Sequence, residues 1–206
     1  MSTIYTSTAD IVSYGLGRQM GEQLAGDPFD GMNANAVAQG VIDAIGGKAS
    51  PVTQEQFVKA FHEINEIMQA KQAEKTKAAA ADGEKFLAEN AKRAEVVVLE
   101  SGLQYEILTQ GKGAKPTAES VIQAHYHGTL VDGTVFDSSI ERGQPASFPV
   151  NRVIAGWTEA LQLMPQGSKW RLFIPQNLAY GAQGSGNKIA PYSALIFDVE
   201  LLAIER

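Results

Sequence analysis

The stretch VIQAHYHGTLVDGTVFDSS, residues 121–139, decides the fold of the second half of the chain. Apolar or small residues occupy the even-numbered positions from Ile122 to Leu130, whereas mainly polar residues occupy the odd-numbered ones. A period of two is typical of a β-strand with one buried face. Asp132-Gly133 is a turn signal that returns the chain into residues 134–136. The stretch therefore predicts two antiparallel strands.

The same period extends outward through the rest of the second half. Residues 169–174 and 195–201 alternate in the same way. In the first of these segments, one face has Trp170, Leu172 and Ile174, and the other has Lys169, Arg171 and Phe173. Between these strands one helical stretch runs from Trp157 to Met164 and ends at Pro165-Gln166-Gly167. Residues 96–206 are thus predicted to form an α+β domain, in which an antiparallel sheet is half-covered by one short helix.

The first half, residues 1–95, has helical periodicity instead. Val12, Leu16, Met20 and Leu24 follow a four-residue step within residues 7–24. A second helix is expected to begin at Asn33 or Asn35 and to stop at residues 46–47. The motif TQEQ, residues 53–56, is a capping box that opens a third helix over about 53–93. The first half is therefore predicted to be all-α.

The third helix would form a rod of roughly 60 Å at 1.5 Å per residue. Its apolar stripe fades after Met68, and a helix that is polar on all sides usually bridges domains. Glu89 stands four residues from both Lys85 and Arg93, which predicts two stabilising ion pairs on an exposed helix. These helices offer a thin core, so we predict a homodimer through residues 1 to about 70, with a monomeric three-helix bundle as the alternative.

The composition excludes several classes of function. The 206 residues carry a net charge of −6, are 44% hydrophobic and include no cysteine. Thiol chemistry, disulfides and cysteine-ligated metals are thereby excluded, and an acidic chain without basic runs argues against nucleic-acid binding. The first twenty residues lack the features of a secretory signal, and no apolar run reaches the ~20 residues that span a bilayer. We therefore expect a cytoplasmic protein that binds neither nucleic acid nor membrane.

Three candidate motifs for catalysis or ligand binding are weak. The glycines at positions 15, 17 and 21 have the spacing GxGxxxG, which differs from the dinucleotide motif and lies in a helical pattern, so close helix packing is favoured. His125 and His127 share a strand face and have a spacing that permits metal binding, but no third ligand is evident. The serines at 138, 139 and 185 lack the GxSxG motif of a nucleophile.

Aromatic side chains are dense in the second half, and most aromatics are core residues. Phe148, Val153, Ile154 and Tyr180, however, lie in or beside loops rich in glycine and proline, where binding residues gather. Aromatic walls around a few polar groups describe a pocket for an apolar ligand. The residues alone leave both interpretations open.

Five segments in the second half resemble FKBP-type peptidyl-prolyl isomerases, which bind tacrolimus and rapamycin. These segments are residues 126–128, 132–139, 153–157, 179–181 and 195–201. The first half, with SYGLGRQMGEQL at residues 13–24, is similar to the macrophage-infectivity-potentiator group of bacterial FKBPs. This resemblance implies that the N-terminal helices dimerise and that the long helices hold two catalytic domains apart in a V.

The resemblance also implies a site. Trp157 would form its floor, Asp137 would accept hydrogen bonds from Tyr126 and Arg142, and the Ile154 amide and Tyr180 hydroxyl would bind substrate carbonyls. The catalytic residues implied are Tyr126, Phe136, Asp137, Ile154, Trp157, Tyr180 and Phe197, and the further binding residues are Arg142, Phe148, Val153 and Ile189. Within the loop at residues 183–188, Lys188 departs from the family pattern.

The implied activity is the isomerisation of X-Pro bonds in unfolded or partly folded proteins, with inhibition by tacrolimus or rapamycin. Such chemistry uses no metal and no cofactor, since only amide resonance has to be lost. The alternative is a dimeric, chaperone-like binding protein for unfolded chains, with isomerisation secondary.

Overall fold

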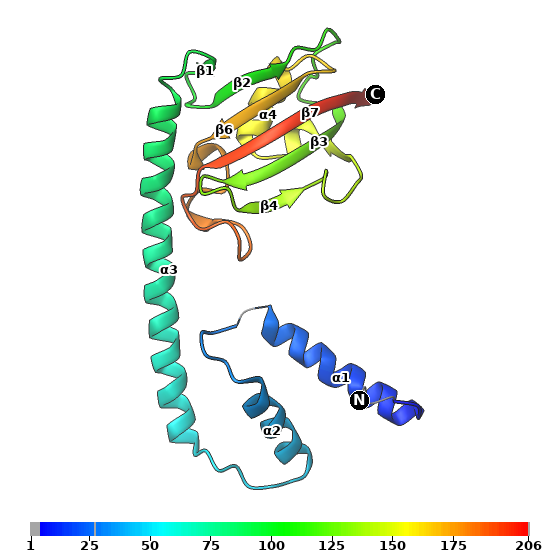
Figure 1. Cartoon of the computed structure of the whole chain (residues 1–206), viewed down its shortest axis with the longest axis vertical. Coiled ribbons are helices and arrows are strands. Elements are labelled where there is room, and N and C mark those ends of the chain that lie inside the picture. Colours follow the sequence, from blue (N-terminus) through cyan, green and yellow to red (C-terminus); the bar gives the residue numbers. More distant parts are fainter. Residues whose placement is uncertain (1–4, 27, 206) are drawn as a thin grey trace. The chain divides into compact units, whose positions relative to one another are not determined.

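The computed structural model describes residues 5–26 and 28–205 (Figure 1). Residues 1–4, 27 and 206, which include the start of the predicted helical domain, lie outside this description. The chain divides into two compact units, residues 1–71 and 72–206. The sequence boundary near residue 95 stays a prediction.

The helices of the first unit begin where the sequence places their caps. In α1 (Thr8–Ala25) the Ser7 hydroxyl accepts the Asp10 amide at 3.1 Å, and Asn33 caps α2 (Ala34–Ile45). Thr53 and Gln56 exchange two hydrogen bonds of 3.0 and 3.2 Å at the start of α3 (Gln54–Asn90), which is the predicted capping box. The predicted helices are confirmed, and α3 ends at Asn90, short of residue 93.

The apolar side chains of α1 and α2 are left uncovered. No described residue of either helix is buried, and Leu16, Met20 and Ile42 are each about half exposed. Within the described part of one chain, nothing lies within 4 Å of a Cβ placed at Gly15, Gly17 or Gly21, so the close helix packing predicted there is not made inside a single chain. The described part of the first unit has no buried apolar core of its own.

The second unit is built on an antiparallel sheet, which has seven strands among the described residues. Its order is β1-β2-β6-β7-β3-β4, and β5 pairs with β3. The strands are β1 (Val96–Val98), β2 (Gln104–Thr109), β3 (Val121–Leu130), β4 (Val135–Ser138), β5 (Ala146–Pro149), β6 (Lys169–Ile174) and β7 (Leu195–Glu205). The strands predicted from the alternating pattern are confirmed, whereas β1, β2 and β5 were not predicted.

One face of the sheet forms the core against α4 (Ala155–Leu163), which lies behind the strands in Figure 1. Ile122 and Ala124 of β3 are fully buried on this face, as the alternation predicts, and they join Leu161 of α4 in one apolar cluster. Gly156 lets α4 approach closely, since a Cβ there would lie 2.5 Å from Ile174. The sheet and α4 thus form the predicted α+β architecture.

The other face of the sheet contacts the last turns of α3. Phe173, predicted on the face opposite Trp170 and Leu172, is only 2% exposed because the Phe86 ring packs against it, with ring centroids 5.9 Å apart. A Cβ at Gly83 would lie 3.0 Å from that of Ala194, so this glycine permits the close approach. Alternation within a strand predicts its faces correctly but does not show which faces a distant helix covers.

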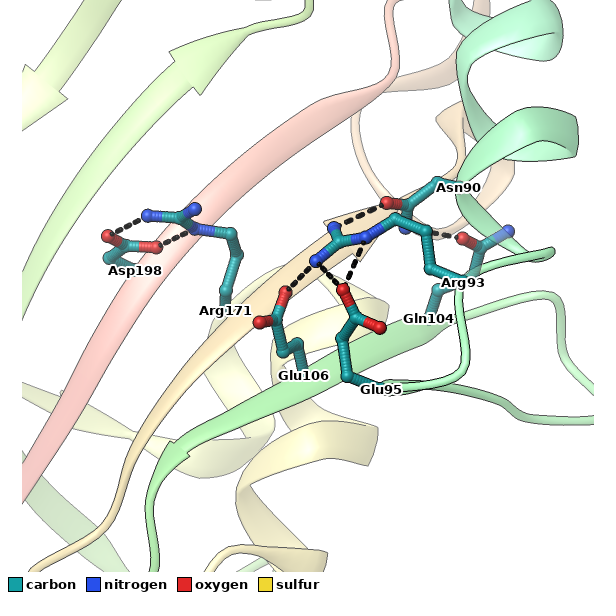
Figure 2. Close-up of polar contacts among 7 residues, drawn as sticks. All are labelled: Asn90, Arg93, Glu95, Gln104, Glu106, Arg171 and Asp198. Carbon is teal, nitrogen blue, oxygen red and sulfur yellow. Dashed lines mark hydrogen bonds and ion pairs between the residues drawn. The ribbon is translucent and has the colours of Figure 1, made fainter.

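Buried polar contacts hold the end of α3 in place (Figure 2). Asn90 is 4% exposed and donates to Gln104 at 2.8 Å, while Arg93 donates to Asn90 at 3.0 Å. The predicted Glu89–Arg93 pair is wrong, because the helix ends at Asn90 and Arg93 turns instead toward Glu95 and Glu106. Glu89 pairs with Lys92, three residues along the chain.

Candidate active site

A cavity of about 730 Å³ lies in the second unit, between the start of α4, the strands β3, β4 and β7, and the loop after β6. Its lining includes ten of the eleven residues proposed from the sequence. These are Tyr126, Phe136, Asp137, Phe148, Val153, Ile154, Trp157, Tyr180, Ile189 and Phe197. Arg142 does not line the cavity but contacts two residues that do.

Trp157, in the first turn of α4, is the centre of the aromatic lining. Its ring meets those of Tyr126, Phe148 and Phe197 edge to face, with centroids 5.2 to 5.7 Å apart and interplanar angles near 80°. This geometry is the favourable one for aromatic pairs. Trp157 is 4% exposed, so the other rings fix its position and it forms a rigid apolar floor.

Phe136 and Phe197 form one wall, with centroids 5.3 Å apart and planes at 82°. Gly128, on β3, makes room for both rings. A Cβ at this glycine would lie 2.7 Å from Phe136 and 2.8 Å from Phe197. The motif at residues 126–128 therefore shapes the cavity in two ways. Tyr126 contributes a ring, and Gly128 leaves the space that the Phe136 and Phe197 rings fill.

Tyr126, Asp137 and Arg142 form the polar edge of the cavity. The Tyr126 hydroxyl donates to Asp137 at 2.6 Å and accepts from Arg142 at 2.6 Å, and Arg142 also pairs directly with Asp137. Burial alone would raise the pKa of Asp137, but the hydrogen bonds from Tyr126 and Arg142 outweigh it and lower that pKa. Burial and the bond to Asp137 raise the pKa of Tyr126. At neutral pH the edge holds a paired carboxylate and a protonated phenol.

The hydrogen bonds that the family resemblance implied for Asp137 are thus present. The Asp137 carboxylate is not deeply buried, since its side chain is 44% exposed. Solvent and Arg142 both compensate its charge, so Asp137 is suited to hold Tyr126 in position rather than to transfer a proton.

Two groups at the cavity are placed to meet a polar ligand. Ile154 is the N-cap residue of α4, and its backbone N–H makes no hydrogen bond with any residue in 5–26 or 28–205. Tyr180 precedes a short 3-10 turn (Gly181–Gln183) and is 39% exposed. An amide donor and a phenol beside aromatic walls can bind peptide carbonyls while the cavity takes an apolar ring.

The remaining lining comes from residues that the sequence did not single out as site residues. Four belong to the loop before Ile189, in which Ser185 and Ile189 form an isolated β-bridge. The fifth is Arg152, which ends the 3-10 turn Val150–Arg152 just before Val153. Arg152 could have been predicted as a site residue from the sequence, because it directly precedes the motif at residues 153–157.

The weaker candidates are placed elsewhere. The rings of His125 and His127 hydrogen-bond the hydroxyls of Ser139 and Ser138, at 3.1 and 3.0 Å. Within the part of the chain that the structure describes, no group of three or more metal-binding side chains surrounds them. A second cavity, of about 600 Å³, lies between the end of α3 and the sheet, where Arg171 pairs with Asp198. His127 lines this second cavity, but none of the eleven residues proposed for the aromatic site does.

The aromatic cavity, with an amide donor and two phenols at its edge, is suited to bind an apolar segment that bears carbonyl groups. A family model described as FKBP-type peptidyl-prolyl cis-trans isomerase matches residues 112–202, and one described as the domain amino terminal to it matches residues 9–107. The FKBP-type 22 kDa peptidyl-prolyl cis-trans isomerase of Escherichia coli K12 is 50% identical over 192 residues, which are 93% of each chain. The chain belongs to the FKBP-type peptidyl-prolyl cis-trans isomerase family.

Two further relatives match all or nearly all of this chain. The outer membrane protein MIP of Legionella longbeachae is 39% identical, with 100% of this chain and 89% of that protein covered. The crystal structure of FkpA from Escherichia coli is similar with a TM-score of 0.68 and 34% identity, over 98% of this chain and 99% of that one. Among the described residues of the present chain, no helix combines the length and the hydropathy needed to cross a membrane.

Proposed function

We propose that this protein accelerates the cis–trans isomerisation of X-Pro bonds by holding the prolyl segment in the aromatic cavity. The observation that carries the proposal is a rigid floor of edge-to-face rings beside a backbone N–H, that of Ile154, which has no partner in the described chain. Such a cavity accepts the proline ring, and the amide can orient a neighbouring carbonyl.

The mechanism follows from the electronic structure of the amide. Rotation requires the loss of amide resonance, and the twisted state has less charge separation than the planar one. An apolar cavity therefore favours the twisted state over the planar ground state. Each ~1.4 kcal/mol of this preference accelerates the reaction about tenfold. Tyr126, held by Asp137 and Arg142, and the Tyr180 phenol would position the substrate, with no bond made or broken.

A protease-free assay with a short X-Pro peptide tests the proposal. Phe197→Ala should reduce kcat/KM about tenfold or more, because it removes one of the two rings that form a wall of the cavity. Phe57→Ala is the matched control, since this phenylalanine lies in the first unit and is 56% exposed. Rapamycin should inhibit the parent protein. Equal turnover by the parent protein and both variants would contradict the proposal.

The exposed apolar residues of the first unit favour a second role, as a dimeric, chaperone-like binding protein for unfolded chains. A groove of about 450 Å³ runs along α1 beside Gly17 and Gly21, and no residue of α1 or α2 in the described chain is buried. Uncovered apolar surface of this kind supports dimerisation through these helices. Two cavities on one dimer would raise the local concentration of sites for one client.

Sedimentation equilibrium tests the dimer directly. The parent protein should sediment as twice its 22.1 kDa mass, and Met20→Glu should reduce the assembly to a monomer while short-peptide turnover persists. If refolding of proline-limited proteins is equally fast with the monomeric variant, the second role is wrong. Location in the cytoplasm stays a prediction.

A further inference from the structure

Two cations at the cavity lack a carboxylate partner. Arg152 is exposed and makes no hydrogen bond or ion pair with any residue that the structure describes. The Lys188 ammonium lies 3.4 Å from the Phe136 carbonyl oxygen, which is its one hydrogen bond within the described chain. They come from separate segments, the turn before α4 and the loop before Ile189. Both line the same cavity.

The other charges at the cavity cancel each other. Asp137 is the one acidic residue in the described lining, and it is already paired with Arg142. The cavity therefore carries two uncompensated positive charges, although the whole protein has a net charge of −6. Low-dielectric walls focus such a local field and attract groups of the opposite sign.

We propose that Arg152 and Lys188 select X-Pro segments that carry an acidic side chain next to the proline, a preference that rests on the proposed isomerase function. The prolyl ring occupies the apolar cavity, and a neighbouring glutamate or aspartate reaches the cations at its edge. The Phe136 carbonyl holds the Lys188 ammonium near the Phe136 wall. Because both cations are solvent-accessible, the pairing is expected to be modest and sensitive to salt.

Matched peptides test the preference. Two series place either Glu or Gln at one position, immediately before the proline in the first series and immediately after it in the second. The measured quantity is the Glu-to-Gln ratio of kcat/KM in a protease-free assay, at about 20 mM and about 500 mM salt. For the parent protein at low salt, we expect a Glu-to-Gln ratio above one in at least one of the two series. Each exposed ion pair that forms should contribute a factor of about 1.5 to 5 to this ratio. At high salt the ratio should fall to near one.

Variants of the full-length protein assign the preference to these residues. The double variant Arg152→Gln and Lys188→Gln should bring the ratio to about one, and each single variant should remove part of it. Lys112→Gln is the control, because Lys112 is exposed and lies outside the described lining of the cavity. Charge reversal by Lys188→Glu should favour a peptide with lysine in place of glutamate, which a purely structural role would not produce.

Each outcome has a defined meaning. A ratio of one in both series of the parent protein overturns the proposal, as does a preference for glutamate that the double variant retains. In either case, turnover of the Gln peptides shows that the isomerase function itself holds. No turnover of any peptide would instead contradict the proposed function.

Discussion

Gly128→Ala is the sharpest test of the cavity, because it adds one methyl group against the two rings that form one of its walls. The new Cβ would lie 2.7 Å from Phe136 and 2.8 Å from Phe197. Carbon atoms in contact normally lie about 3.5–4.0 Å apart, so the rings have to retreat by about 0.7–1.3 Å. Phe197 is only 5% exposed and packs against Trp157, so most of the movement falls on Phe136.

The size of the effect follows from this displacement. Overpacking of this kind costs about 1–3 kcal/mol of unfolding free energy, which lowers Tm by about 2–12 °C in a protein of this size. A 1 Å displacement at a binding site can reduce the rate about 100-fold. We therefore expect kcat/KM for a short X-Pro peptide to fall about 10- to 100-fold, with a moderately lower Tm.

Two further variants make the result interpretable. Gly40→Ala is the matched control, because nothing in the described structure lies within 4 Å of a Cβ there, and a helical alanine should stabilise the protein slightly. Adding Phe136→Leu to Gly128→Ala relieves the crowding, so the double variant should lose less stability than the sum of the two single losses. A Gly128→Ala protein with the Tm and turnover of the parent would refute the proposed shape of the site.

Two other predictions concern polar contacts. Asp137→Asn weakens the hold on Tyr126 and Arg142, so kcat/KM should fall about tenfold in the same assay. Because the pKa of Asp137 is lowered on folding, its contribution to stability is present above about pH 4 and is lost as pH falls through the folded pKa. In urea unfolding between about pH 2.5 and 7, the parent should lose more stability on acidification than Asp137→Asn does. Asn90→Ala removes the donor to the buried Gln104 Oε1 and should cost about 1–3 kcal/mol by chemical denaturation, whereas an unchanged midpoint would contradict that role.

The sequence predicts this fold well where local patterns decide the structure. The face of β3 follows from alternation, and the start of α3 follows from a capping box, because both depend on residues close together in the chain. The strands β1 and β5 have three and four residues, too few to establish a period. In β2, Gln104 faces inward and is 5% exposed because Asn90 binds it, a contact that the strand's own sequence does not show.

The site shows the same division. The aromatic residues of the site could be predicted because each lies within or beside a short motif of consecutive residues, which can be recognised along the chain. Arg152 was missed because it becomes part of the site only when its turn folds beside the cavity. The role of Gly128 was also hidden, since a missing side chain gains its meaning from the two rings that fill the space.

The last turns of α3 explain why the boundary predicted from the sequence composition differs from the boundary between the two compact units. Composition changes near residue 95 because helix gives way to strand there, whereas the compact unit that holds the cavity begins at residue 72. Phe86 covers Phe173, and the Gln104 side chain donates to the Leu87 carbonyl at 2.9 Å. A domain that began at residue 96 would lack Phe86 and so expose Phe173. It would also leave the buried Gln104 side chain without its hydrogen bonds to Asn90 and Leu87. The stable unit that holds the cavity therefore includes the end of the long helix.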